Sequence, residues 1–139
     1  MRGKGFSLLK VGNVEPKVRR MTIPRIKCRV TFLTPDKGGR ARPFPKGALS
    51  GNQYRPHVVV GDPTLLDPGV DQNTLLEDYI GIAFEHGPEI APSGVALEAI
   101  LSLIYFPHPV YDVLTPGADF TIREGRQLVG FGTVLSWLD

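Results

Sequence analysis

Glycine and proline recur so closely along this sequence that a long helix is not expected. The 139 residues include 16 glycines and 13 prolines, which divide the chain into short segments. Inside these segments apolar and polar residues alternate, as at Cys28, Val30 and Phe32, which polar residues separate. A period of two is typical of a strand with one buried face. We therefore predict an all-β fold, an antiparallel barrel of six to seven short strands in one domain.

The same alternation locates the strands, and turn residues separate them. We expect strands over residues 26–32, 54–60, 79–84, 95–105, 111–114, 120–123 and 128–137. The segment Val95–Tyr105 also has the length and composition of a helix, but its apolar residues alternate strictly, which favours a strand. Residues 61–78 contain repeated glycine, proline and aspartate and are predicted to be a loop, in which Thr74–Glu77 could form one helical turn.

Charge divides the sequence into two unequal parts. Residues 1–46 hold thirteen of the sixteen lysines and arginines and two acidic residues, so they carry +11. Residues 47–139 hold three arginines and twelve acidic residues, so they carry −9. This asymmetry could form a face for nucleic acid or for an acidic protein. Alternatively, the two parts could neutralise each other across one folded barrel.

The first 25 residues are predicted to form an extended basic arm. They mix glycine, proline and basic residues without a clear period, although Phe6–Val11 could form a short strand. The barrel would then occupy residues 26–139. No apolar run reaches the length of a membrane helix, and the N-terminus lacks the apolar core of a secretory signal. We therefore expect no membrane association and a cytoplasmic location.

Catalytic and metal-binding patterns are not found in the sequence. His57, His86 and His108 stand far apart, without a second ligand or a paired carboxylate at a useful spacing. Gly38-Gly39-Arg40 is followed neither by a lysine and serine nor by a helix start, so it is not a phosphate loop. The single cysteine, Cys28, alternates with apolar neighbours and is expected in the core. We expect no enzyme activity, no cofactor, no metal and no bound nucleotide.

Three motifs resemble the third domain of elongation factor Tu, a β-barrel. They are Gly38-Gly39-Arg40 with Pro43-Phe44, Tyr54-Arg55-Pro56, and Phe120-Thr-Ile-Arg-Glu-Gly125 followed by Val129–Val134. The resemblance covers about residues 26–136 and implies a Greek-key-type barrel. Only about thirty residues stand where the family has a GTPase domain and a second barrel. We therefore expect a stand-alone domain without the GTPase activity of the family.

The resemblance also implies a set of RNA contacts. In that family the third domain grips the T-stem of transfer RNA, and the matching positions in this sequence are Arg40, His57, Glu124 and Gly125. Arg126 joins this set, and Arg42 and Lys46 are candidate phosphate contacts. The sequence departs from the family pattern because His57 replaces a glutamine and Arg126 replaces a second glycine. The segment 61–78 is also longer than its counterpart.

The expected function is therefore binding rather than catalysis. The first hypothesis is a translation-related module that contacts tRNA, another structured RNA or a ribonucleoprotein through the barrel face. The alternative is a protein-binding module that mimics elongation factor Tu, by binding a partner of that factor or by acting as a decoy or an antitoxin. Leu65, Leu66, Leu75 and Leu76 would favour a protein partner if they were exposed. A structural subunit that joins a larger assembly through its arm is a third hypothesis.

Overall fold

The computed structural model describes residues 23–61 and 79–138, and these residues confirm the predicted all-β class. The strands are β1 (Arg25–Phe32), β2 (His57–Val60), β3 (Ile80–Gly81), β4 (Ala83–His86), β5 (Ala96–Ser102), β6 (Asp119–Glu124) and β7 (Gln127–Trp137). Two short 3₁₀ helices, η2 (Pro35–Lys37) and η3 (Pro109–Val113), lie between strands. In the described part of the chain no helix is long and apolar enough to cross a membrane.

Several predictions concern residues outside the described ranges. They are the arm with its short strand at Phe6–Val11, nearly all of the loop over residues 61–78, the helical turn at Thr74–Glu77, and the four leucines of that loop. These predictions stay predictions.

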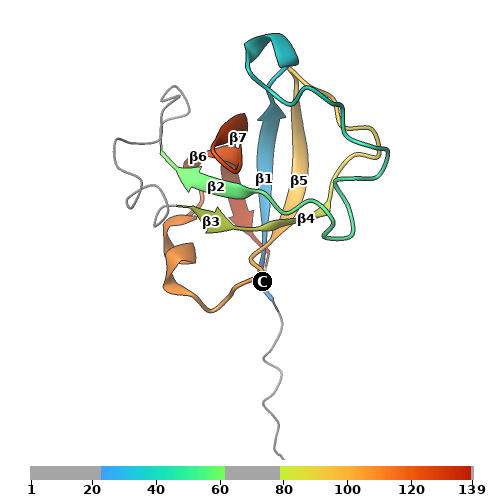
Figure 1. Cartoon of the computed structure of the whole chain (residues 1–139). Coiled ribbons are helices and arrows are strands. Elements are labelled where there is room, and N and C mark those ends of the chain that lie inside the picture. The colour runs from blue at the N-terminus through green and yellow to red at the C-terminus, as the bar shows by residue number, and fades with distance from the viewer. Residues whose placement is uncertain (1–22, 62–78, 139) are drawn as a thin grey trace, which may run out of the picture.

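All seven strands form one antiparallel sheet, which curls until its two edges meet. Its order is β3-β2-β6-β7-β1-β5-β4, and every pair of neighbours is antiparallel. The two strands at the ends of this order, β3 and β4, are separated in the chain only by Ile82. The amides of Ile82 and Phe84 donate to the carbonyls of Pro56 and Tyr54, the residues that lead into β2. The sheet is therefore barrel-like, as Figure 1 shows where β2, β3 and β4 run beside one another.

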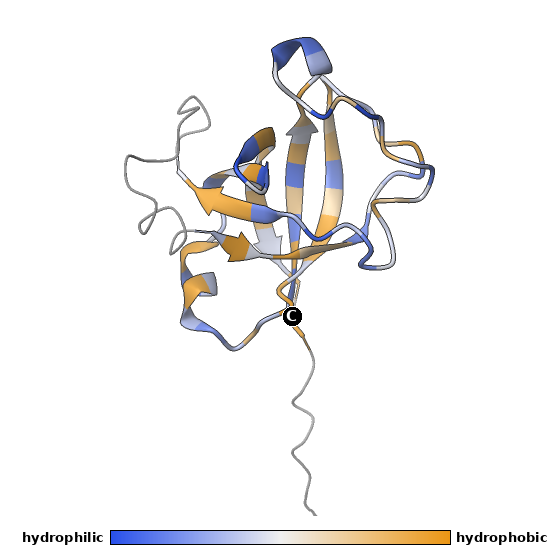
Figure 2. Cartoon of the chain, in the orientation of Figure 1, coloured by the Kyte–Doolittle hydropathy of each residue, from blue (hydrophilic) through white to orange (hydrophobic). Residues whose placement is uncertain are grey.

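The core fills the inside of this curled sheet. In β1 the residues Ile26, Cys28, Val30 and Phe32 are buried and alternate with more exposed neighbours, as the sequence predicts. Figure 2 shows the same alternation as bands of hydrophobic and hydrophilic colour along β1. The central place of β1 explains why this strand has so regular a pattern, since β5 and β7 pair with its two sides.

Most of the ambiguous segment over residues 95–105 is a strand rather than a helix, as predicted, but the strand ends before residues 103–105. Strand β5 covers Ala96–Ser102 and pairs with β1 along its whole length. Leu97, Ala99 and Leu101 are buried, so the alternating side faces the core. Tyr105, at the end of the predicted strand, is instead 64% exposed.

Two other predicted strands have different boundaries in the structure. The prediction of one strand over 79–84 is replaced by β3 and β4, since Gly81 pairs with β2 whereas Ala83 pairs with β5. The strand predicted over 54–60 begins at His57, and in the residues before it the backbone carbonyls of Tyr54 and Pro56 accept hydrogen bonds from Phe84 and Ile82.

The strand predicted over residues 111–114 is wrong, because Pro109–Val113 forms η3. His108 lies between two prolines and caps this turn, since its Nδ1 atom accepts a hydrogen bond of 3.1 Å from the amide of Val110. The Tyr111 side chain is buried, and its hydroxyl donates to the carbonyl of Gly81 at 2.7 Å. The apolar residues of this segment therefore anchor a loop to the barrel instead of forming a strand.

Candidate functional site

The three motifs singled out in the sequence converge at one place on the barrel. Gly38 ends η2 with a φ of +93°, a conformation that suits glycine. A Cβ atom on Gly39 would lie 2.1 Å from the carbonyl oxygen of Leu33, so only glycine fits there. The side-chain amide of Gln127 donates to the carbonyls of both glycines, at 3.3 and 3.1 Å. The Gly-Gly turn is therefore fixed against the hairpin formed by β6 and β7.

Arg40, Glu124 and Tyr54 form a connected group beside this turn. The Nη1 atom of Arg40 lies 3.2 Å from Oε2 of Glu124, and the hydroxyl of Tyr54 donates to the same oxygen at 2.6 Å. The second oxygen, Oε1, takes part in none of the hydrogen bonds or ion pairs among the described residues. The side chains of Arg40 and Glu124 keep 27% and 30% of their exposure. The expectation of a simply exposed carboxylate is thus wrong, because Glu124 is half-buried and already binds two partners.

Aromatic rings pack against the guanidinium of Arg40. The guanidinium carbon of Arg40 lies 4.1 Å from the ring centroid of Phe44 and 5.7 Å from that of Tyr54, which is cation–π distance. The rings of Phe44 and Tyr54 meet edge to face at 4.8 Å, and Phe44 meets Phe32 at the same distance. Burial and the neighbouring carboxylate of Glu124 raise the pKa of Tyr54 far above its ordinary value. Its hydroxyl therefore stays protonated and remains a hydrogen-bond donor at neutral pH.

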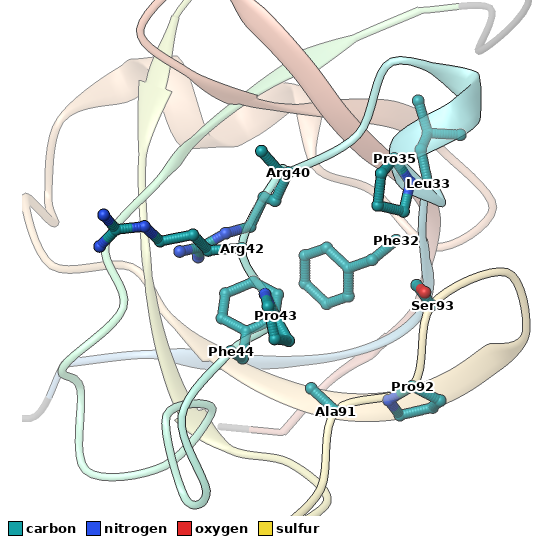
Figure 3. A pocket seen from close by; sticks show the side chains of 11 residues that line it. Phe32, Leu33, Pro35, Arg40, Arg42, Pro43, Phe44, Ala91, Pro92 and Ser93 are labelled. Atoms are coloured by element: carbon teal, nitrogen blue, oxygen red, sulfur yellow. The ribbon is translucent and has the colours of Figure 1, made fainter.

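A small cavity of about 110 Å³ opens next to this group. Its walls are mostly apolar and include Phe32, Pro43 and Phe44, with Ala91 and Pro92 from the segment after β4. Figure 3 shows these side chains around the cavity, while Arg40 and Arg42 extend together away from Pro92 and Ser93. The cavity is too small for a large ligand, but it could receive a side chain of a partner.

The remaining predicted contacts surround the same group, with different partners. Arg42 and Arg126 are exposed, and neither takes part in the salt bridges among the described residues. Lys46 lies 3.4 Å from the carboxylate of Glu89, in a pair that is about 70% exposed. Gly125 is exposed at the hairpin turn with a φ of +61°. Two arginines and one open backbone turn are therefore available to a ligand at this face.

The salt bridges indicate whether the basic and acidic parts of the sequence neutralise each other across the barrel. Each of the four pairs among the described residues joins a cation of residues 1–46 to an acid of residues 47–139, namely Arg25–Glu85, Lys27–Glu98, Arg40–Glu124 and Lys46–Glu89. For these four cations the structure favours neutralisation across the barrel over a continuous basic face.

His57 does not join Arg40 and Glu124. It is exposed at the start of β2, opposite Arg123 of β6, and its ring centroid lies 5.6 Å from that of Tyr79. Both rings line a second, more open cavity of about 510 Å³, together with Tyr105 and other residues of the segment before η3. This cavity was not predicted from the sequence. The available sequence signal was Tyr105, which lies close to Pro107 and Pro109.

Arg123 belongs to the Arg-Glu-Gly motif, although no role was predicted for it. It is 1% exposed, and its Nε atom donates to the hydroxyl of Thr121 at 3.1 Å. The pairing of β6 with β7 shifts register between Ile122 and Arg123, in a β-bulge directly before the turn. The bulge thus sets the direction of the strand where the Arg-Glu-Gly turn begins.

No protein-family model matches the sequence. In residues 23–61 and 79–138 no three His, Cys, Asp or Glu side chains gather closely enough to hold a metal ion. The described site joins the guanidinium of Arg40 to the carboxylate of Glu124, and the apolar cavity lies beside Arg40. Arg42 and Arg126 are exposed.

Proposed function

We propose that this chain is a non-catalytic, translation-related binding module that contacts tRNA or another structured RNA, and that it is a stand-alone relative of the third domain of elongation factor Tu. The convergence of the three motifs supports this proposal. Residues that lie far apart in the sequence, Arg40, Tyr54 and Glu124, meet in one hydrogen-bonded group. The strand order, in which β1 lies between β5 and β7, supports a Greek-key-type barrel.

The observation that carries the proposal is that the two oxygens of Glu124 differ in their partners. Oε2 accepts from Tyr54 and pairs with Arg40, which fixes the carboxylate, and Oε1 has no partner among the described residues. In the shallow minor groove of an RNA helix, 2′-hydroxyl and guanine amino groups are donors that such an acceptor can bind. An isolated carboxylate would repel phosphates, but Arg40 offsets its charge.

The exposed arginines supply the other half of the interface. Arg42 and Arg126 lie on either side of the group in sequence, at the Gly-Gly turn and at the Arg-Glu-Gly turn. A guanidinium binds phosphate oxygens in a planar, bidentate geometry, so both residues suit a nucleic-acid backbone. Each phosphate contact contributes to the salt dependence of binding and none of them reads sequence.

A protein partner is the second candidate, and the small apolar cavity beside Arg40 favours it. An aliphatic or aromatic side chain of a partner of elongation factor Tu could fill this space, which Phe32, Pro43 and Phe44 line. A docked loop would also bury the rings that now support Arg40. Such a complex would survive ribonuclease and would not depend on Glu124 accepting a hydrogen bond.

The test uses the full chain and fluorescence anisotropy with labelled tRNA over a series of salt concentrations. The double variant Arg42→Ala, Arg126→Ala should lower the slope of log affinity against log salt by about 2, close to one for each phosphate that the variant no longer neutralises. Replacing Lys27 and Arg29 of β1 with alanine removes the same charge elsewhere and serves as the matched control. An equal decrease in both double variants would contradict a defined phosphate-binding face.

Glu124→Gln separates recognition from simple charge attraction. The variant removes one negative charge, so binding that depends on charge alone would become tighter. If Glu124 accepts a hydrogen bond as proposed, affinity should instead fall by about fivefold or more, as expected for loss of a charged hydrogen bond. Tighter binding by Glu124→Gln would overturn the proposed role of the carboxylate. Absence of tRNA binding by the unmodified chain would overturn the RNA proposal itself.

A further inference from the structure

The second cavity is an aromatic groove, which we define by His57, Tyr79, Tyr105, His108 and Tyr111. Its volume of about 510 Å³ falls within the range of ordinary ligand pockets. The five rings come from β2, from the residue before β3, from the segment that leads into η3, and from η3 itself. Only Gly81 and Val110 complete the lining among the described residues, so no lysine, arginine, aspartate or glutamate contributes to it. The groove therefore suits a flat, uncharged group.

Tyr105 forms a fixed platform at the edge of this groove. A Cβ atom on Gly81 would lie 2.4 Å from the ring of Tyr105, so the ring rests directly on the glycine backbone. The amide of Tyr105 donates to the hydroxyl of Tyr111 at 2.8 Å, and that hydroxyl in turn donates to the carbonyl of Gly81. One face of the ring is thus supported, and yet the residue stays 64% exposed. A large exposed ring held in this way is ready to stack with another ring.

The groove also offers hydrogen bonds around its edge. Nδ1 of His108 accepts from the amide of Val110, so in the neutral imidazole the hydrogen is on Nε2, which can donate outward. Flat faces with polar edges are the chemistry of a nucleobase.

The groove and the proposed RNA-binding face draw residues from neighbouring strands, since His57 of β2 pairs in register with Arg123 of β6, the residue directly before Glu124. We propose that the aromatic groove binds one unpaired nucleobase of an RNA whose backbone lies along Arg42 and Arg126. This inference rests on the proposed function and adds a specific feature to the RNA, namely a bulged or looped-out base. Proteins commonly recognise such bases by stacking them on aromatic side chains.

The experiment compares two labelled RNA hairpins that differ by one bulged adenosine in the stem, and it uses the full chain. Stacking of a base on an aromatic side chain contributes about 1–3 kcal/mol, so the bulged hairpin should bind about 5- to 150-fold more tightly. Tyr105→Leu should abolish this advantage while leaving the affinity for the fully paired hairpin unchanged. Tyr105→Phe should keep the advantage, because the ring remains.

Phe106→Leu is the matched control, since Phe106 is the next residue, is 47% exposed and does not line the groove. This control should preserve the preference for the bulge. Equal binding of both hairpins by the unmodified chain would overturn the groove inference and leave the proposed function standing. Binding of the bulged hairpin alone, without the Arg42 and Arg126 salt dependence, would support the groove and contradict the proposed face. Failure to bind either hairpin would overturn both.

Discussion

At the scale of single residues, the two oxygens of the Glu124 carboxylate differ in their partners. Oε2 binds Arg40 and Tyr54, and Oε1 has no partner among the described residues. The pair is about 30% exposed, so its contribution to stability is small, as for most ion pairs near water. Its main effect is to fix the position of an acceptor, which matters for recognition more than for folding.

Cys28 gives a prediction about pH at the same scale. Burial raises the pKa of its thiol to about 12, from an ordinary value near 9. Between these values the folded protein keeps the proton whereas the unfolded chain loses it, so stability falls as the pH rises through this window. We expect a loss of about 1 kcal/mol between pH 9 and pH 10, which approaches the limiting slope of about 1.4 kcal/mol per pH unit at higher pH. Urea denaturation at pH 9 and pH 10 measures it.

Cys28→Ala is the control for this prediction. The variant leaves a small cavity in the core and is less stable at every pH, but it lacks the thiol and should lose less stability between pH 9 and pH 10. The comparison ends at pH 10 because burial also raises the pKa of Tyr54 and Tyr111, which contribute at higher pH with the same sign. An identical pH dependence in both proteins would show that Cys28 does not titrate in this way.

At the scale of elements, the glycines of β7 decide how closely two strands can pack. A Cβ atom on Gly132 would lie 2.6 Å from the carbonyl oxygen of Arg29 and 2.8 Å from the ring of Phe120. The backbone of β1 cannot move aside without disturbing its pairing with β5. Gly132→Ala should therefore lower the free energy of unfolding by about 2–3 kcal/mol, as measured by urea denaturation.

Gly117→Ala is the matched control on a loop. Gly117 has a φ of +91°, and no atom lies within 4 Å of the position that an alanine methyl group would take, so alanine there meets only backbone strain. That strain costs about 1 kcal/mol. If Gly132→Ala were no more destabilising than Gly117→Ala, the close approach of β7 to β1 would not be a structural requirement.

The elements also show which features the sequence could predict. The alternation of Cys28, Val30 and Phe32 located β1, because a central strand with one buried face must have that period. The same argument failed at Tyr111, whose burial comes from anchoring η3 rather than from a strand. In a short segment the sequence pattern cannot distinguish an aromatic residue that anchors a loop from one that packs in a sheet, because both are apolar positions.

The contacts among the candidate site residues could not be predicted from the sequence. The resemblance singled out Arg40 and Glu124, yet no local pattern could indicate that they bind each other. His57 was placed with them on the same basis, whereas its ring lies beside Tyr79 in the groove. Contacts between residues distant in sequence depend on strand register, and register follows from the whole sheet rather than from any one segment.

At the scale of the whole molecule, the meeting of the two sheet edges predicts slow hydrogen exchange of the backbone amides at that seam. The amides of Ile82 and Phe84 donate to carbonyls of the Tyr54–Pro56 segment, at 3.3 and 2.9 Å. If the sheet is curled shut at this seam, both amides should be protected against hydrogen exchange to a degree near that of Val30 in β1. Exchange followed by NMR measures this, with the exposed-loop amide of Ser93 as the unprotected reference. Rapid exchange at Ile82 and Phe84 would mean that the edges part in solution.

The central position of β1 has a consequence for how the protein is made. Its two neighbours in the sheet, β5 and β7, follow it by more than sixty residues, since β5 begins at Ala96 and β7 at Gln127. A ribosome that has completed β4 has therefore synthesised neither partner of β1, although the apolar face of that strand has already emerged. During that interval β1 has no strand to pair with along either of its edges. Synthesis thus passes through a stage in which a chaperone has a well-defined segment to shield.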